Sequence, residues 1–567
     1  MNSIRRLLIP LFAIGFTIAC AHDPIEGETD NNTGNINPDV TVRGLVYGEG
    51  NKTLAGVVVS DGLSCVQTDK NGYFELCSDL SRTKFIMVSI PSGYKAPVDQ
   101  NGLPQFFHRV TDLEREANLC EHTFELYPIN NNPDKYTLIV GADPQPRART
   151  AGFDNIAYHS LDICELLYRD MKEKTESMAG RNIFGLMLGD VVHENMTLYD
   201  DYLSGMKTLG FPMFNVIGNH DNDPNAANDS EGANVFEEKL GPTYYSYNIG
   251  KQHYVVLDNL IMRVNEEGSL RDYDQGLTDE IWQWLQNDLA FVDLSTTLMV
   301  AAHSPLFMTS GMSDRSQSSG TRHGKDYAQL LSRYNKVHTW NGHHHTTFNY
   351  VYPEGHRFEN IEVHNVCRSS GELWTNEWAA TGTPRGYTIV EVDGDDISWY
   401  FKPMIYQSAF TGKSPEPEYK HRDWDYDANG VAKMRTDGST LSESYQMHVF
   451  KPGEYYRNFK EQLAGNEPDD NYLYVDVFLW DDKWQVPRFN GQRMTKVDYG
   501  EAYSIVEYEF RSHYYTCGYK LKDYASYVPR DGDIHTIFKI YVGSTSSGGT
   551  VTVTDRFGQE FSSSVSW

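Results

Sequence analysis

The sequence has few cysteines and few basic residues. Seven cysteines in 567 residues are too few for a disulfide-rich scaffold. The 49 Lys and Arg residues stand against 78 Asp and Glu residues, which gives a formal net charge of -29 at pH 7. A protein that follows a long phosphate backbone needs the opposite balance of charge. We therefore expect no nucleic acid partner.

The apolar stretch near the N-terminus, residues 7–19, is too short for a comfortable transmembrane helix. Two arginines precede it and Cys20 follows a small residue, as in a bacterial lipoprotein signal. We expect a signal peptide over 1–20, a lipid anchor at Cys20 as the only membrane contact, and an acidic, flexible tether over 21–40. This indicates an enzyme of the bacterial cell envelope, on the outer membrane or periplasmic face, or a secreted one.

Five polar clusters, each placed after a short apolar run, stand out in the middle of the chain. They are Asp143-Pro-Gln145, Gly189-Asp190, Gly218-Asn219-His220-Asp221, His303 and Gly342-His343-His344-His345. The apolar runs, such as 136–140 and 183–188, are typical of buried strands, and the segments 155–174 and 278–292 have helical spacing. Strands that alternate with helices predict an α/β domain with a mainly parallel sheet, whose ligands gather at the carboxyl ends of the strands.

The clusters combine the ligand types that a pair of metal ions needs. Two cations held a few Å apart require a shared carboxylate, neutral imidazoles and oxygen donors. One cluster alone is weak evidence, because a buried histidine is more often a satisfied core residue. In the last cluster, His343 and His345 lie on the same side of an extended chain and His344 on the other.

The ordered clusters resemble the calcineurin-like metallophosphoesterase superfamily, from Lys135 to about Pro403. The resemblance implies a hydrolase that acts on phosphoric ester bonds, with two divalent or trivalent metal ions, Fe, Mn or Zn. It also implies a central, four-layer β-sandwich flanked by helices. The implied metal ligands are Asp143, Gln145, Asp190, Asn219, His303, His343 and His345.

The same resemblance assigns roles to individual residues. Asp190 would bridge both metals, and His220 would stabilise the transition state or protonate the leaving oxygen, with Asp221 as its orienting partner. The stretch 189–195 is similar to that of double-strand-break-repair nucleases of the superfamily, which implies that His193 lies beside the phosphate. A packed loop histidine is the alternative reading of His193.

Gln145 departs from the family pattern, in which a histidine is usual. Its amide oxygen is a weaker donor toward transition metals than imidazole. Gln145 is therefore either a direct ligand or lies behind a water that completes the coordination.

Candidate substrate contacts flank the clusters. Arg147 follows the first cluster and Arg368 the last, and a guanidinium suits a second phosphate or a carboxylate. Trp374 and Trp378 lie in a loop that resembles one in a secreted bacterial branch of the superfamily. They would either stack on an organic leaving group or cover the edge of the sheet.

Two β-rich regions flank the central domain, 135–403. Residues 41–128 show short strands and turns, and this region resembles the regulatory-like modules of the secreted branch. Residues 408–567 are rich in aromatic side chains and strand-like segments, which predicts a second all-β sandwich. Cys65 and Cys77 flank a turn, so they either pair across a hairpin or pack without a bond.

The sequence thus predicts a metal-dependent phosphoesterase that hydrolyses phosphate esters of small organic molecules through a hydroxide bridging two metals. A small phosphorylated substrate is the expected partner, and monoester and diester substrates both remain open. The alternative is a catalytically reduced, envelope-anchored scaffold or glycan-binding protein, for which Gln145 is the best support.

Overall fold

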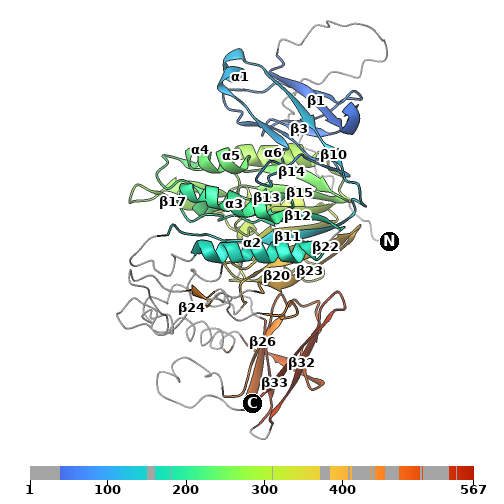
Figure 1. The fold of residues 1–567 in the computed structure, drawn as a ribbon, viewed down its shortest axis with the longest axis vertical. Helices are drawn as coiled ribbons and strands as arrows, with labels where there is room; N and C mark the ends of the chain where they lie inside the picture. Colours follow the sequence, from blue (N-terminus) through green and yellow to red (C-terminus); the bar gives the residue numbers. More distant parts are fainter. Residues whose placement is uncertain are drawn as a thin grey trace, which may run out of the picture.

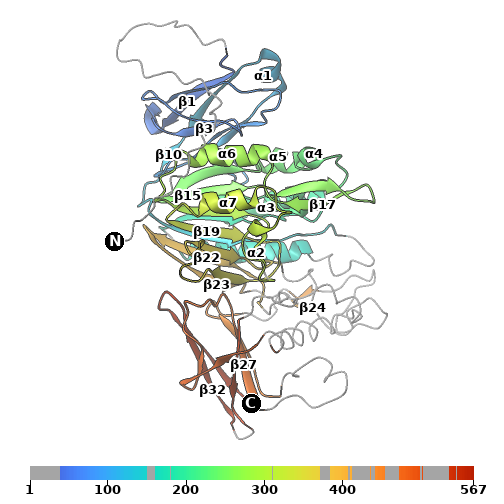
Figure 2. The ribbon, with the colours of Figure 1, turned by 180° about the vertical axis from the view of Figure 1, so that it is seen from behind.

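The chain has three parts along its long axis, with an α/β part between two β-rich ends (Figures 1 and 2). The computed structural model describes residues 39–149, 160–178, 180–309, 311–370, 383–405, 409–410, 434–435, 441–453, 471–498, 501, 536–543 and 546–567. The expected signal peptide, nearly all of the tether, Trp374 and Trp378 lie outside these ranges. Among the described helices, none is long and apolar enough to cross a membrane.

The N-terminal part has two four-stranded sheets, with strand orders β2-β1-β5, where β9 also pairs with β1, and β4-β3-β6-β8, and a two-stranded sheet of β7 and β10. Its elements are β1 Val42–Gly48, β2 Lys52–Thr53, β3 Val58–Ser60, β4 Cys65–Gln67, β5 Tyr73–Leu76, β6 Phe85–Val88, β7 Tyr94–Lys95, β8 Phe107–Arg109, α1 Asp112–Ala117, β9 Cys120–Glu125 and β10 Tyr127–Pro128. The expected strands are present, but the short helix α1 interrupts the all-β pattern. Cys65 is a free thiol and Cys77 is disulfide-bonded, so these two cysteines do not pair with each other.

Helix α1 forms because Thr111 caps it. The Thr111 side chain accepts a hydrogen bond from the Glu114 amide at 3.3 Å, while the Glu114 carboxylate accepts one from the Thr111 amide at 2.7 Å. This reciprocal capping box satisfies two amide groups that the first turn of a helix leaves without a partner. Asn118 then ends the helix in the left-handed conformation, with φ of 50°.

The first sheet of the central part has the strand order β13-β12-β11-β22-β23. Strands β11 Lys135–Gly141, β12 Asn182–Met187 and β13 Met213–Asn215 are parallel, whereas β22 Gly386–Asp393 and β23 Asp396–Pro403 join as an antiparallel hairpin. Helices α2 Ser160–Glu176 and α3 Tyr199–Leu209 pack against this sheet. The sequence predicted β11, β12 and α2 within a few residues, whereas β22 and β23 were not predicted.

The second sheet has the strand order β14-β15-β18-β19-β21-β20. Strands β15 Gln252–Leu257, β18 Thr297–Ala302, β19 Lys336–Asn341 and β21 Ile361–Asn365 are parallel, and β14 Tyr245–Ile249 and β20 Phe348–Val351 are antiparallel edges. Helices α6 Asp279–Leu289 and α7 Gly324–Leu331 cover it. The remaining elements are η1 Glu49–Asn51, η3 Met196–Leu198, η4 Asn219–Asp221, α4 Asp229–Gly232, α5 Asn234–Leu240, β16 Leu260–Val264, β17 Leu270–Gln275 and η5 Arg315–Gln317.

Alternating side chains hold these layers together. Along β11, Leu138 and Val140 enter the core between the sheets, whereas Ile139 packs with α2 and α3. Along β18, Met299 faces the same shared core and Val300 faces the side of α6 and α7. Because both faces of each sheet are covered, the strands are apolar throughout, as their sequences indicated. The result is a helix–sheet–sheet–helix arrangement of two mixed sheets, which is the four-layer sandwich that the family resemblance implied. The strand pattern alone had indicated one mainly parallel sheet.

The C-terminal part contains two four-stranded antiparallel sheets, β26-β27-β31-β30 and β29-β28-β32-β33, within its described residues. Its strands are β24 Ala409–Phe410, β25 Met434–Arg435, β26 Met447–Phe450, β27 Tyr472–Val477, β28 Arg488–Phe489, β29 Gln492–Arg493, β30 Thr495–Lys496, β31 Ile537–Tyr541, β32 Gly548–Thr554 and β33 Glu560–Ser566. Glu362 on β21 joins this part to the centre. Its carboxylate accepts from both terminal nitrogens of Arg556, at 2.8 and 2.9 Å, and from Lys483 at 2.8 Å.

Candidate metal centre

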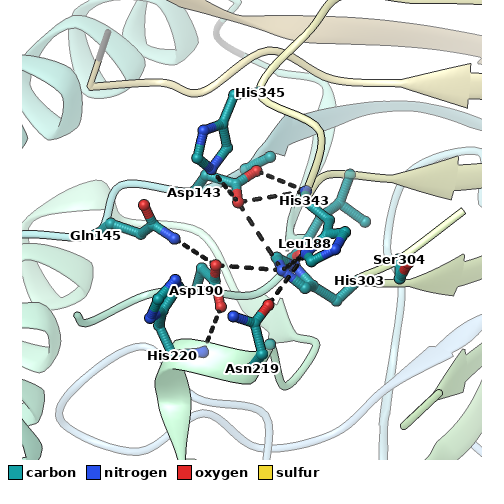
Figure 3. A network of polar contacts seen from close by, with 12 residues as sticks. Asp143, Gln145, Leu188, Asp190, Asn219, His220, His303, Ser304, His343 and His345 are labelled. Atoms are coloured by element: carbon teal, nitrogen blue, oxygen red, sulfur yellow. Dashed lines mark hydrogen bonds and ion pairs between the residues drawn. The ribbon is translucent and has the colours of Figure 1, made fainter. Parts of the chain in front are cut away.

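Loops from both sheets of the central part meet at one seam (Figure 3). Asp143, Asp190 and Asn219 follow strands β11, β12 and β13 of the first sheet, whereas His303 and His343 follow β18 and β19 of the second. All of these strands point their carboxyl ends toward the same place. Parallel strands in two packed sheets therefore assemble side chains that are up to 200 residues apart in the sequence.

The glycines of the motifs are required by the ligands of other motifs. A Cβ atom on Gly218 would lie 2.2 Å from Oδ1 of Asp190, and one on Gly342 would lie 2.5 Å from Oδ2 of Asp143. A Cβ atom on Gly189 would lie 2.7 Å from Nδ1 of His303. Each glycine therefore leaves space for a side chain that another strand delivers.

The backbone of the site is strained where the ligands project. Five of its residues adopt the left-handed conformation, which costs of the order of 1 kcal/mol for a residue with a side chain. Their φ angles lie between 40° and 64°, at Asp143, Gln145, Asp190, His343 and His345. Amide hydrogen bonds between the loops hold two of them, from Asp143 to the Gly189 carbonyl at 3.1 Å and from Gln145 to the Asp190 carbonyl at 3.0 Å.

Two buried carboxylates dominate the charge of the site. Asp143 and Asp190 are 0% and 1% exposed. Nε2 of His303 lies 3.2 Å from the Asp190 carboxylate and 3.9 Å from that of Asp143, and Nε2 of His345 lies 3.6 Å from Asp143. Burial opposes the charged form of His303, but the two carboxylates outweigh it and raise its pKa to about 10. Such a pair requires positive charge between its members.

Hydrogen bonds on the far side of two histidines decide which ring nitrogen faces the centre of the site. Nδ1 of His303 donates to the Leu188 carbonyl at 2.7 Å, which leaves Nε2 toward the carboxylates. Nε2 of His343 contacts the Tyr273 hydroxyl at 2.9 Å, so Nδ1 faces Asn219 Oδ1 at 3.1 Å. Fixing the far nitrogen in this way is the usual arrangement for a metal-binding imidazole. Tyr273, on β17, belongs to no sequence motif and was not predicted.

The donors fit a metal centre of nitrogen and oxygen ligands. One atom each from Asp143, Asp190 and His345 lies within 4.8 Å of the others. A second group beside them consists of Asn219, His303 and His343. Nδ1 of His343 lies 3.1 Å from Asn219 Oδ1 and 3.3 Å from Nε2 of His303. Carboxylate, amide and imidazole donors suit Fe, Mn and Zn alike, so the donor set does not select one of these metals.

Gln145 lies against the carboxylate of Asp190. Its amide nitrogen donates to Oδ2 of Asp190, and its amide oxygen points away (Figure 3). In this orientation, Gln145 is a hydrogen-bond partner of the Asp190 carboxylate. Direct ligation requires the amide to be reversed, which exchanges two atoms of nearly equal size.

His220 has an environment distinct from the other histidines. Its amide donates to Asp190 Oδ1 at 2.9 Å, and its Nδ1 lies 3.2 Å from the Glu194 carboxylate. Arg271 contacts the other oxygen of Glu194 at 2.7 Å. Burial disfavours the imidazolium of His220, but Asp190 and Glu194 outweigh it and raise its pKa.

His193 stacks on His220 with ring centroids 4.3 Å apart. Burial and the neighbouring His220 lower the pKa of His193 to about 2, so its ring is neutral. A neutral ring stacked on the His220 ring fits a supporting role for His193.

The prediction that Asp221 orients His220 needs correction. The Asp221 carboxylate is fully buried and accepts hydrogen bonds from the amides of Gly218 at 2.8 Å and Val192 at 3.1 Å. These contacts fix the loop that carries Asn219. Glu194, which the sequence motif contains but whose role was not predicted, is the carboxylate that contacts the His220 ring.

Both predicted arginines act on the site. Arg368 is fully buried. Its charge adds to the fall in the pKa of His193 that burial causes, and it opposes the overall rise in the pKa values of Asp143 and His220. Arg147 is half-buried and acts on His193 and Glu194. These two arginines therefore place positive charge beside the site, despite the net charge of -29 of the chain.

A methyl group at position 218 tests the packing of the site. We expect Gly218→Ala to displace the Asp190 carboxylate, because the added Cβ would lie 2.2 Å from it. The variant should lose most of its bound metal while its circular dichroism spectrum stays unchanged. Gly320→Ala is the matched control, since its nearest neighbour would lie 3.8 Å away. Equal metal content in both variants would contradict this account.

Metal binding should release protons. His303 is protonated at pH 7 in the metal-free protein, since its pKa is raised to about 10, and binding through Nε2 requires that proton to leave. We expect apparent affinity to rise with pH, by up to about tenfold per pH unit, until about pH 10. Calorimetric titrations with metal in buffers of different protonation enthalpy measure the proton release. His344→Gln is the control and should release protons as the wild type does. A heat independent of the buffer would refute the prediction.

Comparisons with known proteins place the chain in a family. Family models match residues 40–128, as the N terminal of calcineurin-like phosphoesterase, 159–347, as calcineurin-like phosphoesterase, and 363–561, as the C terminal of calcineurin-like phosphoesterase. No curated protein matches the chain. The central match contains four of the five clusters and lies between the two companion matches.

Solved structures show distant similarity. A dimetal phosphatase from Danio rerio is 13% identical over 48% of this chain and 96% of its own, with a TM-score of 0.34. Purple acid phosphatase PPD1 from yellow lupin is 14% identical over 48% of this chain and 52% of its own, with a TM-score of 0.34. A 5'-nucleotidase from Candida albicans is 11% identical over 47% and 52%, with a TM-score of 0.29. The alignment thus spans about half the length of the last two proteins.

Likeness at this level carries no information about the substrate. The family models, in contrast, follow the order of the N-terminal, central and C-terminal parts, and the central one contains most of the metal-ligand motifs. The chain therefore belongs to the calcineurin-like phosphoesterases and is a hydrolase that acts on phosphate esters.

Proposed function

We propose that the chain hydrolyses phosphate monoesters of small organic molecules at a centre of two metal ions. The observation that carries this proposal is the position of Asp190. One oxygen of its carboxylate faces His303 and Gln145, and the other accepts from the amide of His220. A carboxylate placed between two groups of donors suits a ligand shared by two ions.

The two groups of donors divide the proposed ligands. Asp143 and His345, with Gln145 beside them, would hold one ion, and Asn219, His303 and His343 would hold the other. When bound, the ions activate a water molecule and polarise the phosphoryl group.

His220 is the proposed acid for the leaving group. Glu194 holds its Nδ1, which leaves Nε2 for the substrate, and the raised pKa of His220 favours the charged ring. Arg271 fixes the other oxygen of Glu194, so the pair has a defined orientation. A proton delivered by His220 to the departing oxygen avoids the formation of an alkoxide.

Arg147 and Arg368 are the proposed contacts for the phosphate. A monoester carries a second negative charge, which two guanidinium groups suit better than the single charge of a diester. A phosphodiester is the alternative substrate within this class, because the same metal ligands serve both. Trp374 and Trp378 remain proposed contacts for the organic group.

The leaving group distinguishes the role of His220 from a structural one. We expect His220→Gln and Glu194→Gln to slow hydrolysis of an alkyl phosphate by about 10²-fold or more, since the poor leaving group needs a proton. Hydrolysis of a nitrophenyl phosphate should fall much less, because nitrophenolate leaves without protonation. The kcat for both esters and the bound metal are the measurements.

Glu266→Gln is the matched control, because Glu266 is exposed on the turn after β16. Equal losses on both esters would remove His220 from the acid role. A metal-loaded wild-type protein that cleaves neither monoesters nor diesters would instead support the scaffold or glycan-binding alternative.

We also propose that Cys20 carries a lipid that holds the enzyme in the cell envelope. The support is the pattern of charged, apolar and small residues before Cys20. In a bacterial host, the wild-type protein should partition into the detergent phase and Cys20→Ser into the aqueous phase. Identical partition of the two proteins would contradict the anchor.

A further inference from the structure

A second group of metal-binding side chains lies in the N-terminal part. His108 on β8, Glu114 on α1 and Cys120 at the start of β9 each offer one ligand atom, and these atoms lie within 4.8 Å of one another. The side chains of His108 and Glu114 are 22% and 20% exposed, and Cys120 is fully buried. The group is at the opposite end of the molecule from the C-terminal sheets (Figures 1 and 2).

The Glu114 carboxylate is held in place before any ion binds. Its Oε2 accepts from the amide and the hydroxyl of Thr111, at 2.7 and 2.8 Å. Its Oε1 lies 2.9 Å from Nε2 of His108. Oε2 also lies 3.1 Å from the same nitrogen, so both oxygens reach the imidazole while Oε2 serves the helix cap as well.

The rest of the group is equally well positioned. Cys120 is fixed by the register of β9 on β1, in which it pairs with Val42. The His122 ring stacks on the His108 ring, with centroids 4.1 Å apart and an interplanar angle of 17°. This stacking sets the plane of the His108 ring and hence the direction of its Nε2.

The charges around the thiol favour a cation. The charged groups that act on Cys120 are the carboxylates of Glu114 and Glu121, of which Glu121 also pairs with Arg43 at 2.6 Å. Burial and these carboxylates raise the pKa of Cys120 to about 12.

A similar cluster on the second sheet lacks this property. His338, Glu362 and His364 also lie close together, but Arg556 and Lys483 already occupy the Glu362 carboxylate. A metal ion there would face two cations at short range. Proximity of ligand atoms alone therefore does not select the N-terminal group. What distinguishes it is that, among the described residues, the Glu114 carboxylate pairs with His108 and with no lysine or arginine.

We propose that His108, Glu114 and Cys120 bind a zinc ion. A thiolate with an imidazole and a carboxylate is a donor set for zinc, and not for magnesium or calcium, which prefer oxygen ligands. On binding, the Cys120 thiol loses its proton to solvent and forms the sulfur–metal bond. The neutral His108 ring carries its remaining proton on Nδ1, which leaves Nε2 for the ion. Water completes the tetrahedral coordination.

Cobalt is the probe for this site, because a thiolate ligand gives Co²⁺ a charge-transfer absorption. Carboxylate, imidazole and amide ligands, which the central site offers, do not give this band. The full-length protein loaded with Co²⁺ should show the band and hold three ions. Cys120→Ser should remove the band, hold two ions and retain the phosphatase activity of the wild type.

Two further variants keep the test decisive. Cys65→Ser is the matched control, because Cys65 is also a free thiol of the N-terminal part, and it should retain the band. His108→Gln, at a partly exposed position, should weaken cobalt binding at this site by at least about tenfold and serves if Cys120→Ser does not fold. A wild-type protein without the band, or a band that persists in Cys120→Ser, would overturn the proposal.

Discussion

Two carboxylates without access to solvent, Asp143 and Asp190, set the requirements for the central part of this protein. A pair of buried negative charges needs compensation by cations and by hydrogen bonds. The raised pKa of His303 is the response of the metal-free protein to that requirement. The glycines before the ligands and the left-handed turns at them have the same origin, since both allow loops from two sheets to approach one small volume. Metal ions that bind carboxylate, amide and imidazole groups supply this compensating positive charge directly.

The sequence was informative where spacing and order carry the information. Strands β11, β12 and β18 are apolar on both faces, and each precedes a polar cluster, so their positions were predictable. The strand pattern alone did not separate the two sheets, because a buried strand gives the same apolar pattern in either sheet, whereas the family resemblance implied a four-layer sandwich. The partners of the ligands were missed for another reason. Arg271 and Tyr273 lie on β17, and only the folding of that hairpin brings them to Glu194 and His343.

Asp221 and Glu194 show how a motif can mislead at the level of a single side chain. Asp221 follows His220 directly, yet its carboxylate binds the amides of its own loop and of Val192. Glu194 is 26 residues away in the sequence and contacts the imidazole. Adjacent residues on a tight turn point in different directions, so proximity in the chain does not give proximity of side chains.

The flanking parts add features at a distance from the site. These are the pairing of Glu362 with Arg556 and the proposed zinc group around α1.

The central claim is that Asp190 is shared by two metal ions bound by loops of both sheets. Anomalous diffraction from crystals of the metal-loaded protein tests it most directly. The account predicts two peaks, one beside Asp143 and His345 and one beside Asn219 and His343, with the Asp190 carboxylate in contact with both. A single peak, or two peaks of which only one touches Asp190, would contradict it.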